Sequence, residues 1–246
     1  MRAIFTFHSI DNRGSVLSYS PRHFHMLLDS LAARNIPVHD LDTLLQPDTL
    51  QGVALTFDDG MKSVYQNALP AISEHGVSAH LFAATTAVEQ GNPWPRQSAG
   101  IPSFEMLDWN ELEKLHAAGI FIESHTHSHP DMRTLSKTQM EDECGRADDT
   151  IEKHLGRRPD YFAYPFGYHN REVRDFARQR YRGTVTTELR QLGNREDTAA
   201  LPRLDTFYLQ SGTCIRNIDS WLLAGYLGAR NILRNIRGSQ CRADCD

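Results

Sequence analysis

Short apolar runs alternate along the chain with longer runs in which apolar residues recur at helical spacing. Apolar residues at positions i, i+3, i+4 and i+7 indicate an amphipathic helix, whereas short continuous apolar runs indicate buried strands. In Pro21–Arg34, for example, Phe24, Leu27, Leu28 and Leu31 fall on one helical face. The pattern therefore predicts repeated strand–helix units.

The predicted strands are Ala3–Phe7, Val53–Phe57, Ser78–Ala84, Ile120–Glu123, Tyr161–Tyr164 and Thr184–Thr187. The predicted helices are Pro21–Arg34, Lys62–His75, Asn110–Ala118, Ser136–Leu155, Arg171–Arg180 and Ile218–Arg237. Ser136 followed by Gln139 forms a capping box, and Gly156 ends the same helix. Repeated strand–helix alternation favours parallel strands joined by crossover helices, hence an α/β barrel or an open sheet.

Composition and charge narrow the class of protein. A chain of 246 residues with 40% hydrophobic residues fits one globular domain. The net charge of −5 and the lack of a long basic run argue against nucleic acid as a main partner. The start of the chain lacks the long apolar core of a signal peptide, and no apolar stretch is long enough to span a bilayer, so we expect a cytoplasmic protein. The four cysteines (Cys144, Cys214, Cys241 and Cys245) indicate neither a disulfide framework nor a complete zinc site.

Two adjacent carboxylates, Asp58 and Asp59, follow the predicted strand Val53–Phe57 and precede Gly60. The carboxyl ends of parallel strands are where α/β proteins gather their active sites. At the end of a strand two neighbouring side chains can diverge, so that one carboxylate binds a cation and the next faces a substrate. Taken alone, the same residues equally fit a turn that caps the following helix.

A histidine cluster follows another predicted strand. His125, His127 and His129 alternate between Glu123 and Pro130, at what should again be a carboxyl end. Imidazole nitrogens suit zinc and its first-row neighbours, and two histidines with one carboxylate leave positions open for water and substrate. At strand spacing all three imidazoles would share a face, whereas on a helical turn only His125 and His129 would. The cluster favours a catalytic metal over a solvated polar turn.

Three segments in order carry a resemblance to a family. They are Thr56-Phe-Asp-Asp-Gly60, His125-Thr-His-Ser-His-Pro130 and Tyr161-Phe-Ala-Tyr-Pro-Phe-Gly167. Together they resemble the polysaccharide deacetylases of carbohydrate esterase family 4, also called the NodB-homology domain, over His8 to about Asp205. The resemblance implies a distorted (β/α)7 barrel. It also implies a catalytic domain over residues 1–210, with the C-terminal helix and polar tail of residues 211–246 packed on it.

The resemblance implies a role for each matching residue. Asp58 would be the general base, and Asp59, His125 and His129 would hold one divalent metal ion. Zinc is the expected metal, although cobalt and nickel accept the same ligands. The backbone N–H of Phe166 would help to hold the oxyanion. The implied activity is removal of N-acetyl groups from an N-acetylhexosamine-containing glycan or glycan precursor.

The chain departs from the family pattern at two places. Ala163 stands where the family usually has an arginine that orients the base, and Arg203 is the candidate replacement; it also fits an ordinary surface arginine. No histidine follows His169 to serve as the usual late general acid. Phe7-His8-Ser9-Ile10 resembles the first strand of circularly permuted biofilm-polysaccharide deacetylases, so His8 is the candidate acid, and an imidazole titrates in a range that suits protonation of an amine.

Several alternatives stay open from the sequence. The substrate is a carbohydrate, and the bond cut could instead be a formamide or another amide on a lipid-linked amino sugar, or the chain could be a non-catalytic glycan-binding module. The loop Gln90–Pro102 carries Trp94, which fits either packing or stacking on a sugar ring. The helix Ile218–Arg237 is expected to pack on the domain, and its arginines also fit contact with a membrane surface.

Overall fold

The computed structural model describes residues 1–90 and 102–243, with side chains described as far as Leu233. Seven parallel strands form one sheet in the order β8-β7-β6-β5-β4-β1-β9. They are β1 (Arg2–Phe7), β4 (Gly52–Phe57), β5 (Ala79–Ala83), β6 (Ile120–Ser124), β7 (Tyr161–Ala163), β8 (Gly183–Val185) and β9 (Leu204–Asp205). A separate pair is formed by β2 (Ser9–Ile10) and β3 (Ser18–Tyr19). The sheet curls into a half-barrel, which confirms the predicted seven-stranded α/β architecture.

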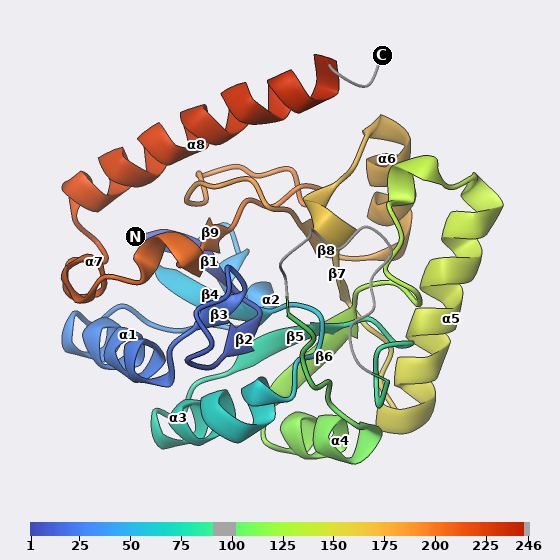
Figure 1. The fold of residues 1–246 in the computed structure, drawn as a ribbon, viewed down its shortest axis with the longest axis horizontal. Helices are drawn as coiled ribbons and strands as arrows, with labels where there is room; N and C mark the ends of the chain where they lie inside the picture. Colours follow the sequence, from blue (N-terminus) through green and yellow to red (C-terminus); the bar gives the residue numbers. More distant parts are fainter. Residues whose placement is uncertain (91–101, 244–246) are drawn as a thin grey trace.

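Helices surround the sheet, as Figure 1 shows. They are α1 (Pro21–Ala33), α2 (Leu41–Leu44), α3 (Leu69–Glu74), α4 (Trp109–Ala117), α5 (Lys137–Leu155), α6 (Arg171–Arg180), α7 (Gly212–Arg216) and α8 (Trp221–Ala243). The predicted capping box of α5 is present, because the Ser136 hydroxyl accepts from Gln139 N–H and the Gln139 side chain accepts from Ser136 N–H. Gly156 ends this helix at φ +69°, a left-handed conformation in which glycine avoids the steric cost of a side chain.

Alternate side chains of the central strands enter two different hydrophobic clusters. Phe5 and Leu55 pack outward with the surrounding helices, whereas Ile4 and Ala54 point into the half-barrel with Phe82. Successive side chains of a strand point to opposite faces, and both faces of this sheet are buried. The continuous apolar runs seen in the sequence follow from this double burial.

One predicted helix differs in the structure. The run Lys62–His75 forms a π-helix at Val64–Ala68 followed by α3, instead of one continuous α-helix. Pro70 lies in this run and has no N–H to donate, and a proline ring also crowds the carbonyl four residues before it. The wider π-turn accommodates Pro70 near the start of α3.

The open edges of the half-barrel, β8 and β9, are connected by the segment that precedes β9. Val185 pairs with Leu201 in an isolated parallel bridge, and Thr186 N–H donates to the carbonyl of Leu201 at 2.8 Å. Two residues later, Arg203 N–H donates to the carbonyl of Glu188 at 2.9 Å. This segment therefore places Arg203 across the barrel opening, next to the ends of the central strands.

Candidate active site

The carboxyl ends of β1 and β4 bring His8 and Asp58 together. The two strands pair in parallel with Phe7 opposite Phe57, so the residues that follow them lie side by side. Asp58 N–H donates to the carbonyl of Phe7 at 2.9 Å, and His8 Nε2 lies 4.0 Å from Asp58 Oδ2. Asp58 is buried, whereas the side chain of His8 keeps about a quarter of its surface exposed.

The backbone turns sharply between the two carboxylates. Asp59 has φ +72° and Gly60 has φ +88°, and Gly60 N–H donates to the carbonyl of Asp58 at 2.9 Å. A left-handed conformation is uncommon for a residue with a side chain and is found where a turn or a functional site requires it. The turn separates the partners of the two carboxylates, so that Asp59 faces the histidine loop and Asp58 faces Arg203.

Asp59, His125 and His129 converge on one point. His125 Nε2 and His129 Nε2 lie 3.1 Å apart, and they are 3.5 and 3.6 Å from Asp59 Oδ1. All three residues are buried. Within the described residues, this is the only group of three such side chains with ligand atoms close enough to share an ion.

The hydrogen bonding of His125 fixes which nitrogen faces this point. His125 Nδ1 lies 2.7 Å from the carbonyl of Ala163, which can only accept, so Nδ1 carries a proton and Nε2 is the atom that faces Asp59 and His129. A backbone carbonyl that orients a ligating histidine in this way is a common feature of metal sites. Ala163 thus contributes to the candidate site through its main chain.

The ionisation of the trio suits a cation. Burial by itself would raise the pKa of Asp59, but the hydrogen bond with His125 and the neighbouring imidazoles hold it well below its usual range. Burial and the charge of His125 lower the pKa of His129 to about 3, so its imidazole is neutral. Burial would lower the pKa of His125 as well, yet the two aspartates raise it. The site therefore offers an ionised carboxylate, Asp59, beside two imidazoles.

The spacing of the trio fits a tetrahedral transition-metal ion. Ligand atoms about 2.0–2.1 Å from a zinc ion at tetrahedral angles lie roughly 3.3 Å from one another. The three separations of 3.1, 3.5 and 3.6 Å bracket this value. Two imidazoles and one carboxylate also leave a fourth position for water or substrate. The residues present therefore fit a catalytic divalent metal.

His127 does not join the trio. Its Nδ1 lies 2.7 Å from Thr85 Oγ1, and its carbonyl accepts from the N–H and hydroxyl of Thr86, both at 2.9 Å. The loop turns at Thr126 and His129, whose φ values are +66° and +56°. This turn places His125 and His129 on one side and His127 on the other.

Glu143 on α5 supports this loop and was not identified from the sequence. Its Oε2 accepts from the N–H groups of His127 and Ser128 at 3.1 and 2.8 Å, and its Oε1 accepts from the Ser128 hydroxyl at 2.8 Å. Hydrogen bonds to an ionised acceptor are stronger than those between neutral groups. Glu143 therefore stabilises the turn that separates His127 from the two converging histidines.

Arg203 contacts Asp58 through both oxygens of the carboxylate. Its two terminal nitrogens donate to Oδ1 and Oδ2 at 2.7 Å each, and Nε donates to the carbonyl of Thr186 at 2.9 Å. Arg203 is only 1% exposed, which rules out the alternative of an ordinary surface arginine. Burial would raise the pKa of Asp58, but the guanidinium outweighs it and the pKa is lowered. Asp58 is thus ionised and held in one orientation.

Phe166 lies beside the trio, with its ring centroid 4.6 Å from that of His129. Its φ of +59° belongs to the tight turn Pro165–Gly167. Gly167 is required there, because it has φ +71° and a Cβ added to it would lie 2.2 Å from Thr187 Oγ1. The segment that resembles the family's third motif therefore comes within contact distance of His129.

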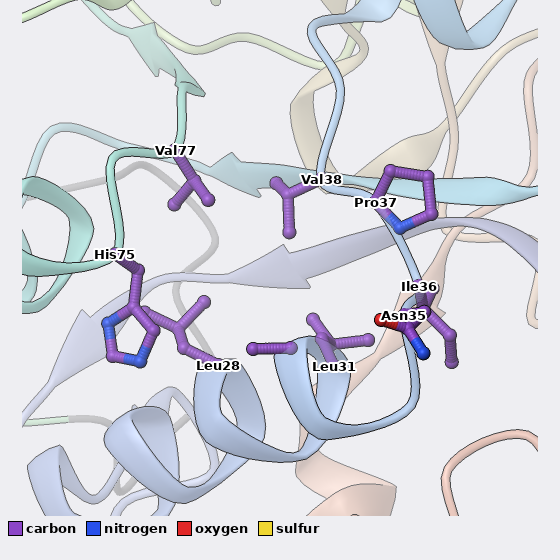
Figure 2. A pocket seen from close by; sticks show the side chains of 9 residues that line it. Leu28, Leu31, Asn35, Ile36, Pro37, Val38, His75 and Val77 are labelled. Atoms are coloured by element: carbon purple, nitrogen blue, oxygen red, sulfur yellow. The ribbon is translucent and has the colours of Figure 1, made fainter.

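Trp94 and most of the loop Gln90–Pro102 fall outside the described residues. The apolar pocket in Figure 2, about 390 Å³ in volume, is lined by Leu28, Leu31, Ala32, Asn35, Ile36, Pro37, Val38, His75 and Val77. None of these residues belongs to the candidate site, so this pocket is separate from it.

A family model described as polysaccharide deacetylase matches residues 46–181, which is more than half of the chain. The chain belongs to the polysaccharide deacetylase family. The matched segment contains Asp58, Asp59 and the histidine loop, whereas His8 and Arg203 lie outside it.

Curated relatives of this family share part of their length with the chain. A chitin deacetylase of Colletotrichum lindemuthianum is 28% identical over 136 residues, covering 55% of this chain and 49% of the relative. A poly-β-1,6-N-acetyl-D-glucosamine N-deacetylase of Staphylococcus aureus is 28% identical over 132 residues, covering 49% of this chain and 42% of the relative. The chain thus spans about half the length of the curated relatives it matches.

Solved structures of the family share the fold. The Streptococcus pyogenes deacetylase PplD in complex with acetate superposes with a TM-score of 0.71 and 21% identity, covering 82% of this chain and 91% of PplD. IcaB from Ammonifex degensii superposes with a TM-score of 0.69 and 22% identity, covering 87% and 96%. These matches agree with the family assignment and extend the likeness in fold to most of the chain.

Proposed function

We propose that the chain is a divalent-metal-dependent hydrolase that removes N-acetyl groups from an N-acetylhexosamine-containing glycan or glycan precursor. The observation that carries this proposal is the convergence of Asp59, His125 and His129 beside a carboxylate, Asp58, that Arg203 holds in place. Membership of the polysaccharide deacetylase family supports the reaction type. The names of the curated relatives, which act on chitin and on poly-β-1,6-N-acetyl-D-glucosamine, support a glycan as substrate.

Asp59, His125 and His129 would hold the metal, with zinc as the expected ion and cobalt or nickel as alternatives. A divalent cation in this position polarises the acetamide carbonyl and lowers the pKa of water. A metal ligand set needs only Asp59 and the two histidines. The presence of a second, ionised carboxylate at Asp58 therefore supports catalysis over metal binding alone.

Asp58 is the proposed general base. It takes a proton from the attacking water as the new C–O bond forms, and its ionised state is maintained by the two hydrogen bonds from Arg203. Arg203 acts as a positioning residue, because it reaches the reaction only through Asp58. The bidentate contact limits rotation of the carboxylate, which keeps the accepting oxygen in a fixed direction.

His8 is the proposed general acid. It follows β1, its Nε2 lies 4.0 Å from Asp58 Oδ2, and about a quarter of its side-chain surface is exposed. The imidazolium gives its proton to the amine nitrogen as the C–N bond breaks, so the products are acetate and a free amino sugar. The N–H of Phe166 is the proposed donor to the oxyanion, a contact whose loss typically costs about 3 kcal/mol.

A screen for released acid tests the proposal. Metal-reconstituted protein would be incubated with β-1,4- and β-1,6-linked N-acetylglucosamine oligomers and with lipid-linked acetamido and formamido sugars, and acetate and formate would be quantified separately. Acetate release from at least one glycan supports the proposal. Formate release alone would assign the chain as a deformylase, and release of neither acid by the metal-loaded protein would indicate a binding module.

A further inference from the structure

Helix α8 presents a large apolar face to solvent. Leu223 and Leu227 pack into the main hydrophobic core, whereas Trp221 is 80% exposed and Leu222 and Ile232 are each 63% exposed. Five of the nine large hydrophobic side chains that are exposed among the described residues lie on this one helix: Trp221, Leu222, Tyr226, Ile232 and Leu233. Figure 1 shows α8 running along one edge of the molecule, from α7 toward the side that carries α6.

These five side chains share one side of the helix. At 100° per residue they fall within an arc of about 140°, and Leu223 and Leu227 point to the opposite side. Gly225 and Ala229 lie within the same arc and Gly228 lies just beyond its edge, so none of them adds a polar side chain to it. The exposed residues therefore form one continuous apolar surface rather than scattered contacts, and such surfaces mark interaction sites.

The charge of α8 is opposite to that of the rest of the chain. Trp221–Ala243 contains four arginines and no acidic residue, a formal charge of +4. The remaining residues carry 22 basic and 31 acidic side chains, a formal charge of −9. A second copy of the same helix would meet this charge with an equal positive charge. An anionic surface, by contrast, complements it.

The residues beside the apolar face fit a helix that lies flat on a bilayer surface. Arg230 Nε donates to the hydroxyl of Tyr226 at 3.3 Å, and its guanidinium lies 5.2 Å from the ring centroid of Tyr208. It therefore lies beside the apolar arc, toward the domain. Tryptophan and tyrosine favour the headgroup level of a bilayer, and arginine at the edge of an apolar face reaches lipid phosphates from there. Within the described residues, none of the helices combines the length and apolarity needed to cross a membrane.

We propose that the outward face of α8, formed by Trp221, Leu222, Tyr226, Ile232 and Leu233, docks on the surface of an anionic lipid bilayer. The helix lies in the plane of the interface, with its apolar side chains among the acyl chains and Arg230 at their edge, near the level of the phosphates. The docking uses none of the candidate catalytic residues and stands independently of the proposed reaction.

Sedimentation of the full chain with lipid vesicles tests this inference. The wild type should bind vesicles of phosphatidylcholine with phosphatidylglycerol, bind pure phosphatidylcholine more weakly, and lose affinity as salt is raised. The double variant Leu222→Ser/Ile232→Ser should bind at least about tenfold more weakly, because it removes two apolar anchors. Leu50→Ser is the matched control, since Leu50 is also exposed but lies far from α8 in the sequence, and it should bind as the wild type does.

Two further measurements keep the outcome unambiguous. The thermal midpoint and the metal content of each variant show whether it is folded. We expect both to match those of the wild type, because neither substitution touches the buried side of α8. A wild type that binds neither type of vesicle overturns the inference. It is overturned equally if the wild type is a dimer in solution that Leu222→Ser/Ile232→Ser converts to a monomer, because the apolar face would then be covered by a second copy.

Discussion

Arg203 and Asp58 form a bidentate ion pair across 145 residues of sequence, with both N···O distances at 2.7 Å. Asp58 follows β4, and Arg203 comes from the short segment that connects the open edges of the half-barrel. The pair therefore depends on closure of the fold rather than on local sequence. It holds the candidate base ionised and oriented beside the converging trio.

Arg203→Lys tests the positioning role of this pair. A lysine keeps the positive charge but cannot donate two parallel hydrogen bonds to one carboxylate. We expect kcat for deacetylation to fall by about 10- to 100-fold with little change in KM, because the base loses its fixed direction. Arg182→Lys is the control, since Arg182 forms exposed ion pairs away from the site. Equal kcat values for both variants would contradict the role assigned to Arg203.

Asp58→Asn tests the base itself. The substitution keeps the size of the side chain but removes its ability to accept a proton. The deacetylation rate should fall by about 10²- to 10⁴-fold, the range typical of general acid–base catalysis. Zinc affinity, measured by calorimetry, should stay close to that of the wild type, because Asp59 and the histidines supply the ligands. A variant that binds zinc and retains the wild-type rate would rule out Asp58 as the base.

His127 and His129 lie two residues apart in the same loop, so substitutions at the two positions can be compared directly. His129→Ala should lower zinc affinity by about 100-fold or more, because it deletes one of three protein ligands. His127→Ala should change zinc affinity only slightly, because the His127 imidazole faces Thr85 instead of the trio. Calorimetric titration of both variants with zinc measures the difference. Similar losses in the two variants would mean that the loop binds metal in a different arrangement.

Glu143→Ala tests the support of the loop by α5. Removing a carboxylate that accepts three hydrogen bonds should weaken zinc binding by about tenfold, as is typical when a group that orients metal ligands is lost. Glu141→Ala is the matched control on the same helix, because Glu141 is exposed and its carboxylate lies 3.9 Å from Lys137 Nζ, one helical turn away. If the zinc affinities of the two variants are equal, Glu143 stabilises the fold without positioning the ligands.

The motifs that come directly after predicted strands were predictable from the sequence. Asp58 and Asp59 follow an apolar run, and the histidine cluster follows another, so the carboxyl ends of two parallel strands already indicated one site. The residue pattern alone left open which of the three histidines converge with Asp59, and only the family resemblance pointed to His125 and His129. The convergence depends on left-handed turns at Thr126 and His129, in a loop whose His127 backbone is hydrogen-bonded to Glu143 and Thr86.

The contacts that depend on tertiary packing could not be predicted from local sequence patterns. Glu143 lies in the middle of an amphipathic helix, where a glutamate is ordinarily solvated. The strand β9 has two residues, too few for a periodic pattern, so the sequence pattern assigned no element to the connection that carries Arg203. Arg203 was a candidate through the family resemblance alone. Its pairing with Asp58 follows from the way this segment closes the barrel.

The proposed reaction requires one divalent cation, held by Asp59, His125 and His129. Its most direct test is a titration of chelator-treated protein with zinc while acetate release is followed. We expect no activity without metal, a linear rise that ends at one equivalent of zinc, and no recovery in the Asp59→Asn variant at the same zinc concentration. Full acetate release by the chelator-treated protein would contradict this requirement.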